Sequence, residues 1–315
     1  MKKPEPLPLD GLTTHSLSGR HSKVSLRDFA QPWEKGGSLK EFVARLPQVL
    51  AGSDFKEVAA AWVQARKGGR QVLLGMGAHP IKVGLSPIII NLLQKGLLNG
   101  VALNGAGIIH DAEIAMVGCT SEDVDQDLGC GRFGMARETA EFLNSAISWG
   151  AGEGLGLGEA VGRRLLAADF PHQHLSLVAA AADLGVPVTV HVAVGTDIIH
   201  LHPSVDPEAL GKTTHLDFRL FAALVSRLSE GMFLNLGSAV ILPEVFLKAL
   251  TLARNLGHKV SPLTTVNLDF IQHYRPLTNV VRRPTAGAGQ GYALTGHHEL
   301  LFPLLAAAVL EEMEG

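Results

Sequence analysis

The sequence contains little cysteine, few aromatic residues and little charge. Its two cysteines, Cys119 and Cys130, are too few for a disulfide framework and lack the spacing of a metal-binding knuckle. Charged residues make up 18% and hydrophobic residues 46%, a balance that excludes a mainly disordered chain. The 27 Lys and Arg face 30 Asp and Glu with no basic block, so we do not expect a nucleic acid partner.

Long uninterrupted apolar stretches are also missing. Every window long enough to span a bilayer contains a charge or a Gly or Pro break, so we expect no membrane partner. The N-terminal residues MKKPEPLPLDGL carry two lysines with no apolar segment behind them, and they predict no signal peptide. A cytoplasmic location is therefore expected.

The chain is rich in glycine, with 35 residues, and in aliphatic residues. Residues 1–38 are polar and interrupted by Pro and Gly, whereas Ser38 starts a helical pattern that a second helix follows over about 54–67. We interpret residues 1–69 as an N-terminal arm with helices packed on the core, and residues 70–315 as the main domain.

From Arg70 onward, short apolar runs end in glycine-containing loops and are followed by helical patterns. The runs are QVLLGMGAH, GVALNGAG, VPVTVHVAVGTD and MFLNLGSAV. Continuous apolar strands alternating with helices predict an α/β fold, a Rossmann-like doubly wound parallel sheet. The segment GAGEGLGLG at 150–158 resembles a dinucleotide fingerprint but follows no predicted strand, so we interpret it as a flexible stretch between helices.

Small residues gather where four predicted strands end, at 75–79, 104–107, 195–197 and 237–239. Ligands of open parallel sheets bind beyond this edge, and small residues let the backbone approach a nucleotide. The alternative is that these glycines only end the strands tightly. The predicted cofactor-binding residues are Gly77, Ala78, Asn104, Gly105, Ala106, Gly107, Gly237, Ser238, Ala239 and His297.

Histidine is abundant, with 14 residues, and half of these fall at the same predicted edge: His79, His110, His191, His200, His202, His297 and His298. Imidazole titrates near neutrality and suits acid–base catalysis. We predict His110 or His200 as the acid–base group, with Asp197 orienting it or binding a hydroxyl. Each histidine could instead be structural. His200 and His202 could share a metal, but no strong metal motif occurs and we predict no metal ligands.

Other polar segments allow a functional and a structural interpretation. The acidic segment 121–129 suits a solvated loop or helix start better than a cation site. Arg282 and Arg283 precede the loop TAGAGQG, which could close over an anion or form a solvated turn. Ser238 lies in LGSAV rather than GxSxG, which argues against serine hydrolase chemistry.

Four segments in order resemble the deoxyhypusine synthase family, over roughly residues 70–310. They are GAHPIKVGLSPIIINLLQKGLLNGVALNGAGIIHD, VPVTVHVAVGTDIIHLHP, LNLGSAVILPEVFLKAL and LLFPLLAAAVLEE. The resemblance implies a deoxyhypusine-synthase-like fold and a homotetramer with NAD sites at subunit interfaces. It also implies that Asn104–Gly107 occupies the place of the family's NAD-contacting loop.

The family's catalytic lysine has no counterpart here, because no lysine follows Lys259. Leu242, Pro243 and Glu244 stand near the place of the family's His-His base. We therefore expect an NAD-binding enzyme acting on a small molecule other than the lysine and spermidine pair, by hydride transfer with histidine acid–base catalysis. Alternatives are a metal-dependent hydrolase using the histidines, a non-catalytic ligand-binding paralogue, or a true synthase using Lys82 or Lys248.

Overall fold

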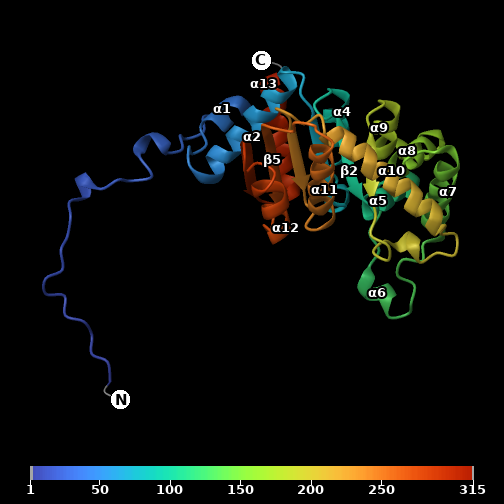
Figure 1. Ribbon diagram of the computed structural model, residues 1–315, viewed down its shortest axis with the longest axis horizontal. Coiled ribbons are helices and arrows are strands. Elements are labelled where there is room, and N and C mark those ends of the chain that lie inside the picture. Colours follow the sequence, from blue (N-terminus) through green and yellow to red (C-terminus); the bar gives the residue numbers. More distant parts are fainter. Residues whose placement is uncertain (1–2, 314–315) are drawn as a thin grey trace.

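A parallel sheet of six strands, in the order β3-β2-β1-β4-β5-β6, forms the centre of the fold (Figure 1). The computed structural model describes residues 3–313. The strands are β1 (Val72–Met76), β2 (Gly100–Asn104), β3 (Val188–His191), β4 (Met232–Leu236), β5 (Leu263–Asp269) and β6 (Gly289–Thr295). This order confirms the predicted doubly wound sheet, and it reverses between β1 and β4, which pair with Met76 beside Leu236.

The helices that surround the sheet account for most of the remaining chain. They are α1 (Leu39–Ala44), α2 (Leu50–Lys67), α3 (His79–Lys82), α4 (Ser86–Gln94), α5 (Gly105–Val117), α6 (Val124–Leu128), α7 (Arg137–Glu153), α8 (Leu157–Ala167), α9 (Leu177–Asp183), α10 (Pro207–Val225), α11 (Ile241–Asn255), α12 (Tyr274–Pro276) and α13 (His298–Met313). Within residues 3–313, no helix has the length and apolar character to cross a membrane.

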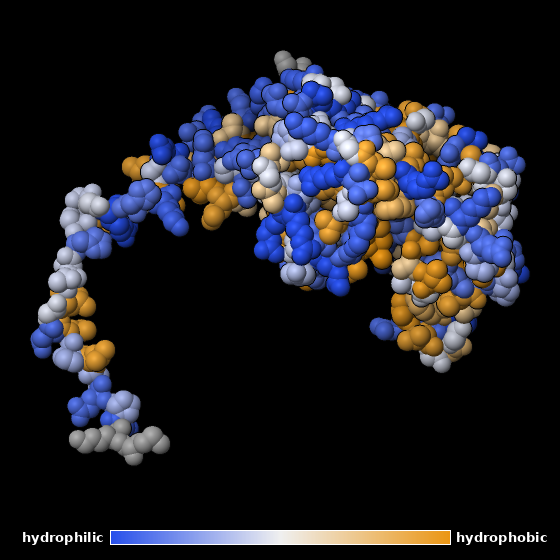
Figure 2. All heavy atoms as spheres, in the orientation of Figure 1, coloured by the Kyte–Doolittle hydropathy of each residue, from blue (hydrophilic) through white to orange (hydrophobic). Residues whose placement is uncertain are grey.

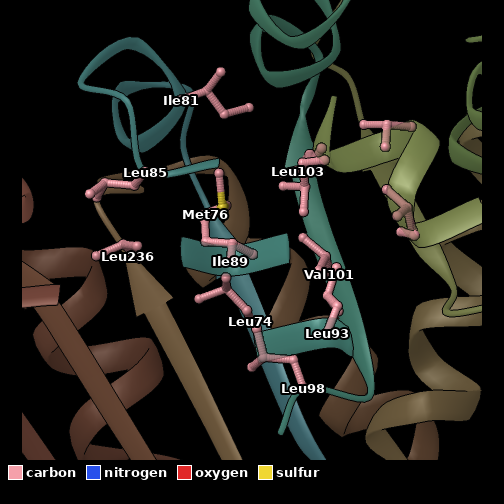
Figure 3. Packing of buried hydrophobic residues seen from close by; sticks show 14 of the residues in the cluster. Leu74, Met76, Ile81, Leu85, Ile89, Leu93, Leu98, Val101, Leu103 and Leu236 are labelled. Atoms are coloured by element: carbon pink, nitrogen blue, oxygen red, sulfur yellow. The ribbon is translucent and has the colours of Figure 1, made fainter. Parts of the chain in front are cut away.

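Each face of the sheet has its own apolar core, because successive side chains of a strand point to opposite faces. On one face, Leu74 and Met76 of β1 pack with Val101 and Leu103 of β2 beneath helices that include α2, α4, α5 and α13 (Figure 3). On the other face, Phe233 stacks on Phe246 of α11 with ring centroids 3.9 Å apart. Burial on both faces explains the continuous apolar runs of the first four strands.

Strands β5 and β6 were not among the strands predicted from the apolar runs. Strand β5 reads LTTVNLD and hides its polar side chains inside, where the Asn235 amide donates to Asn267 Oδ1 at 2.7 Å. Strand β6 lies at the edge of the sheet and begins with glycine, so it lacks the apolar run of a central strand.

The segment 150–158 is not a flexible stretch, because α7 continues to Glu153 and α8 begins at Leu157. Its glycines allow close packing instead. A Cβ atom at Gly150 would lie 2.3 Å from Ala160 Cβ, and one at Gly158 would lie 2.1 Å from the Val188 carbonyl oxygen.

Residues 3–37 form an extended arm that leads away from the sheet (Figure 1). Helix α1 begins after Ser38, whose hydroxyl accepts from the Glu41 amide in a capping box. Helices α1 and α2 then pack against α13. The division of the chain at residue 69 stays a prediction.

Candidate active site at the carboxyl edge of the sheet

A cavity of about 220 Å³ lies beside the first turn of α5, at the carboxyl ends of β2 and β3. One wall comes from α5 and the loop after β3, and Lys82 of α3 adds a cation. The segment 121–133 supplies the opposite wall and carries α6. The lining residues that bear on chemistry are Lys82, Ala106, His110, Glu113, Glu122 and Asp197.

Asp197 sits in this wall because the first turn of α5 leaves room for its carboxylate. A Cβ atom at Gly105 would lie 2.0 Å from Asp197 Oδ2, so any larger residue there would displace the carboxylate. Burial raises the pKa of Asp197 to about 6, although the Ala106 amide, which donates to the carboxylate, opposes this shift. A carboxyl group with a pKa near neutrality can both accept and release a proton.

His200 lies behind Asp197. Its Nδ1 accepts from the Gly195 amide at 3.1 Å, so in the neutral ring the proton is on Nε2. That Nε2 lies 3.9 Å from Asp197 Oδ2, and neither atom has another hydrogen-bond partner within residues 3–313. A buried donor and a buried acceptor therefore face each other across a gap slightly too long for a direct bond.

His110 is held by a hydroxyl on the far side of its ring. The Thr120 hydroxyl donates to Glu113 Oε2, so it can only accept from His110 Nδ1, at 2.6 Å. The neutral ring then carries its proton on Nδ1 and presents Nε2 as an acceptor. Burial, with Lys82 adding a smaller effect, lowers the pKa of His110 to about 4, and the ring is neutral at pH 7.

The predicted residues thus fall into two neighbouring places. Ala106, His110 and Asp197 line the cavity, with His200 behind it. Asn104, Gly105 and Gly107 form the end of β2 and the first turn of α5, next to Ala106 of the lining. The remaining predicted residues follow β1, β4 and β6, where the Gly77 amide donates to the Leu236 carbonyl. They are Gly77, Ala78, Gly237, Ser238, Ala239 and His297.

The two helix starts at this edge differ in their free amides. In α5, the Ala106 amide is taken by Asp197 and the Gly107 amide by Asn104 Oδ1 at 3.1 Å, so an anionic phosphate would compete with a carboxylate. In α11, Ser238 Oγ accepts from Leu242, and no acceptor within residues 3–313 faces the amides of Ala239 and Val240. The start of α11, rather than that of α5, therefore fits a phosphate group.

A second polar group lies at the ends of β1, β5 and β6 and contains His79, Asp269 and His298. The sequence placed both histidines at this edge without a role, and Asp269 was missed because β5 was not predicted. Two polar side chains that follow β6 in tandem, His297 and His298, were the available signal.

The histidines do not gather around a common metal position. Within the described part of the chain, no three His, Cys, Asp or Glu side chains come together as a metal-binding group. His202 Nδ1 instead contacts the Ser204 hydroxyl at 2.7 Å. The acidic segment holds a short helix, α6, and its Glu122 accepts from the Gly134 amide at 2.8 Å.

The part of the chain around α6 exposes apolar side chains. Val124, Leu128 and Met135 are exposed, and the projection that carries α6 shows apolar atoms in Figure 2.

No protein-family model matches the chain, and no curated protein matches its sequence. Solved structures match in fold. A candidate deoxyhypusine synthase from Entamoeba histolytica gives a TM-score of 0.52 at 12% identity, over 90% of this chain and 96% of that one. A candidate LOR/SDH protein from Methanococcus maripaludis S2 gives 0.53 at 14% identity, over 94% and 76%.

A third match is AgrE in a complex with ornithine and NAD+, with a TM-score of 0.53 at 15% identity. It covers 82% of this chain and 33% of that chain, so the protein spans about a third of AgrE. The cyanobacterial arginine dihydrolase ArgZ matches with 82% and 31% coverage. These likenesses establish a deoxyhypusine-synthase-like α/β fold.

Proposed function

We propose that the protein is an NAD-dependent enzyme that oxidises or reduces a small molecule held in the 220 Å³ cavity. The observation that carries this proposal is the meeting of His110 and Asp197 in one cavity at the carboxyl edge of a doubly wound sheet. One group is a neutral acceptor, and the other is a carboxyl group whose burial raises its pKa to about 6.

The proposal places NAD beyond β1 and β4, next to the cavity. Gly237, Ser238 and Ala239 would hold its phosphates at the start of α11, and Gly77 and Ala78 would pass beneath it. The bound nicotinamide supplies a hydride acceptor or donor. AgrE, which shares the fold, has been crystallised with NAD+, and this supports the choice of cofactor.

The protein's own residues would manage the proton that accompanies hydride transfer. His110 Nε2 would accept it from the substrate, and Glu113 and Thr120 would keep the ring in the tautomer that leaves this nitrogen free. Asp197 would bind a substrate hydroxyl or amine, or take the proton itself. His200 Nε2 would donate to Asp197 once the carboxylate moves toward it.

The substrate proposed for this cavity differs from a polyamine. The cavity lining combines the cation of Lys82 with the carboxyl groups of Glu113, Glu122 and Asp197, a mixed charge rather than the wholly acidic lining that a polycation prefers. Lys248, the other lysine considered for a synthase mechanism, is ion-paired with Glu244 on the surface of α11. Lys248 is not among the residues that line the cavity.

The cofactor is tested by isothermal titration calorimetry with NAD+ and NADH. We expect binding to the wild-type protein and at least tenfold weaker binding to Ala239→Asp, because the new carboxylate would repel the phosphates. Ala60→Asp, on the exposed face of α2, is the matched control and should bind as the wild type does. No heat and no thermal stabilisation at millimolar NAD+ or NADH would refute the proposal.

The roles in the cavity are tested separately. His110→Gln and Asp197→Asn should retain cofactor affinity and lose NADH formation with a panel of small hydroxy and amino compounds. Unchanged turnover in both variants, and in His200→Gln, would rule out this cavity as the active site. Cofactor binding with no turnover of any compound would favour a non-catalytic ligand-binding protein.

A further inference from the structure

Three side chains from different strand ends form a chain of close polar contacts at the carboxyl edge of the sheet. His79 follows β1 as the first residue of α3, and its Nδ1 lies 2.9 Å from Nδ1 of His298, the first residue of α13. His298 Nε2 lies 3.5 Å from Oδ1 of Asp269, the last residue of β5. The chain therefore leads from a buried carboxylate through a buried imidazole to a half-buried imidazole.

The surroundings fix this arrangement. Gly237 has φ +66°, and a Cβ atom there would lie 2.5 Å from His298 Cε1, so the backbone directly after β4 leaves room for the ring. Phe270 packs against both imidazoles, with centroids 5.9 Å from His79 and 5.6 Å from His298. The Phe270 amide donates to Asp269 Oδ1 at 2.8 Å.

The contacts define where the protons are. His298 Nε2 makes no hydrogen bond within residues 3–313, but Asp269 Oδ1 lies 3.5 Å from it. A lone pair on Nε2 would face the negative carboxylate, so the neutral ring holds its proton on Nε2 and its Nδ1 is an acceptor. The short contact between the two Nδ1 atoms requires one proton, so His79 donates it. In the neutral pair, His79 consequently carries its proton on Nδ1, and its Nε2 holds a lone pair.

We propose that Asp269, His298 and His79 form a proton relay, in which His79 Nε2 takes a proton from a hydroxyl bound at this edge of the sheet. The O–H bond of the ligand breaks and leaves its electron pair on the oxygen, an N–H bond forms at His79 Nε2, and the Nδ1 proton of His79 moves to His298 Nδ1. The positive charge then resides on His298 beside Asp269, and His79 ends neutral. His298 and Asp269 are positioning residues in this scheme.

The relay rests on the proposed function for its ligand, because His79 shares α3 with Lys82 of the cavity lining. Several charged or titratable groups face His79. Burial is the main cause that lowers its pKa, His298 and Lys82 act in the same direction, and Glu299 and Asp269 oppose them. His297 stacks on Phe270, with centroids 6.1 Å apart.

The first test is NMR spectroscopy of the full chain labelled with 15N-histidine, at a pH where both rings are neutral and without NAD. We expect the Nδ1–H tautomer for His79 and the Nε2–H tautomer for His298. A His79 ring protonated at Nε2 would overturn the relay, because its outer nitrogen would then be a donor. This measurement needs no variant.

The second test is acylation of His79 by diethyl pyrocarbonate, followed by mass spectrometry of peptides. Attack through Nε2 needs the Nδ1 proton to leave, so Asp269→Asn and His298→Gln should each slow acylation of His79 at least threefold. His215→Gln, exposed on α10, is the control and should leave the rate unchanged. Circular dichroism and thermal melting verify folding, and if His298→Gln does not fold, Asp269→Asn decides.

Unchanged acylation in folded Asp269→Asn would overturn the relay and reduce the chain of contacts to a structural one. The outcomes separate the two proposals. Expected tautomers without NAD binding would refute the cofactor and leave the relay intact, whereas NAD binding with the wrong tautomers would do the reverse.

Discussion

Two histidines at the same edge of the sheet are linked to carboxylates in different ways. His110 reaches Glu113 through the Thr120 hydroxyl, and we call these residues the threonine-linked group. His79 reaches Asp269 through the His298 ring, and we call these residues the imidazole-linked group. A hydroxyl orients its partner, whereas a second imidazole can also keep a proton and its charge.

The difference affects what each outer ring can do. In the threonine-linked group a proton taken by His110 stays on a ring whose pKa is lowered to about 4 by burial and Lys82. In the imidazole-linked group the charge can move inward to a ring beside a carboxylate. Both outer rings present an acceptor nitrogen, but the first keeps the charge of an accepted proton on the outer ring, whereas the second can pass that charge to the inner ring.

The largest effect should come from glycines that make room for each group. Gly237→Ala places a side chain at φ +66° and 2.5 Å from the His298 ring, and it should reduce the free energy of unfolding by about 2–4 kcal/mol. Gly105→Ala meets the Asp197 carboxylate but favours the helix, and it should cost about 1–2 kcal/mol. Urea unfolding measures both changes.

Gly152→Ala is the matched control for these two variants. It lies within α7 with nothing within 4 Å of the added Cβ atom, and it should leave stability unchanged or raise it by up to about 1 kcal/mol. A Gly105→Ala variant that loses more stability than Gly237→Ala would contradict the comparison.

An intermediate effect is expected for Asp197→Asn in the cavity. Burial raises the folded-state pKa of Asp197 from 3.8 to about 6, so the folded protein holds this proton more tightly than the unfolded chain does. The free energy of unfolding therefore falls as the pH rises from 3.8 to about 6, by about 3 kcal/mol at most for this group. In Asp197→Asn the side chain does not titrate, so this pH-dependent loss of unfolding free energy is removed.

Urea unfolding below and above that pH window measures the change in the free energy of unfolding for the wild type and for Asp197→Asn. The variant should lose less stability than the wild type between the acidic and the neutral sample. Part of the dependence remains, because burial also raises the pKa of Asp111 to about 6 and that of Asp217 to about 7. An unchanged difference between the two samples would show that Asp197 titrates normally.

The smallest effect should come from Lys82→Gln, because the Lys82 charge acts on the histidines of both groups. Lys82 is exposed, and its charge contributes to the lowered pKa of both His110 and His79. Its removal should raise both pKa values while stability changes by less than about 0.5 kcal/mol. Histidine ring resonances followed against pH report the shifts. A pKa shift in only one of the two histidines would show that the Lys82 charge acts on one group alone.

Much of the fold is predictable from local patterns. Continuous apolar runs predicted β1 to β4, and Ser38 predicted the start of α1. The same rule missed β5 because its polar residues find partners only across the sheet, as Asn267 does with Asn235. It also misjudged residues 150–158, since the glycines there serve contacts with Ala160 and Val188 that no local pattern reveals.

The candidate site was predictable in its residue types rather than in its connections. A polar or small residue at a predicted strand end pointed to Asn104, His110 and Asp197 as neighbours of one edge. No sequence signal linked Asp197 to the first turn of α5. Because Asp197 occupies the Ala106 amide there, the helix start with free amides is that of α11. Asp269 could not be chosen before β5 was known.

The sequence by itself determined an α/β chain with buried parallel strands and its small and imidazole-bearing residues at their carboxyl ends, because apolar runs and glycine loops act locally. Only the tertiary structure decided which ring meets which carboxylate. Strand order and helix packing set distances such as the 2.9 Å between His79 and His298, and those distances fix the tautomers and the acid–base behaviour.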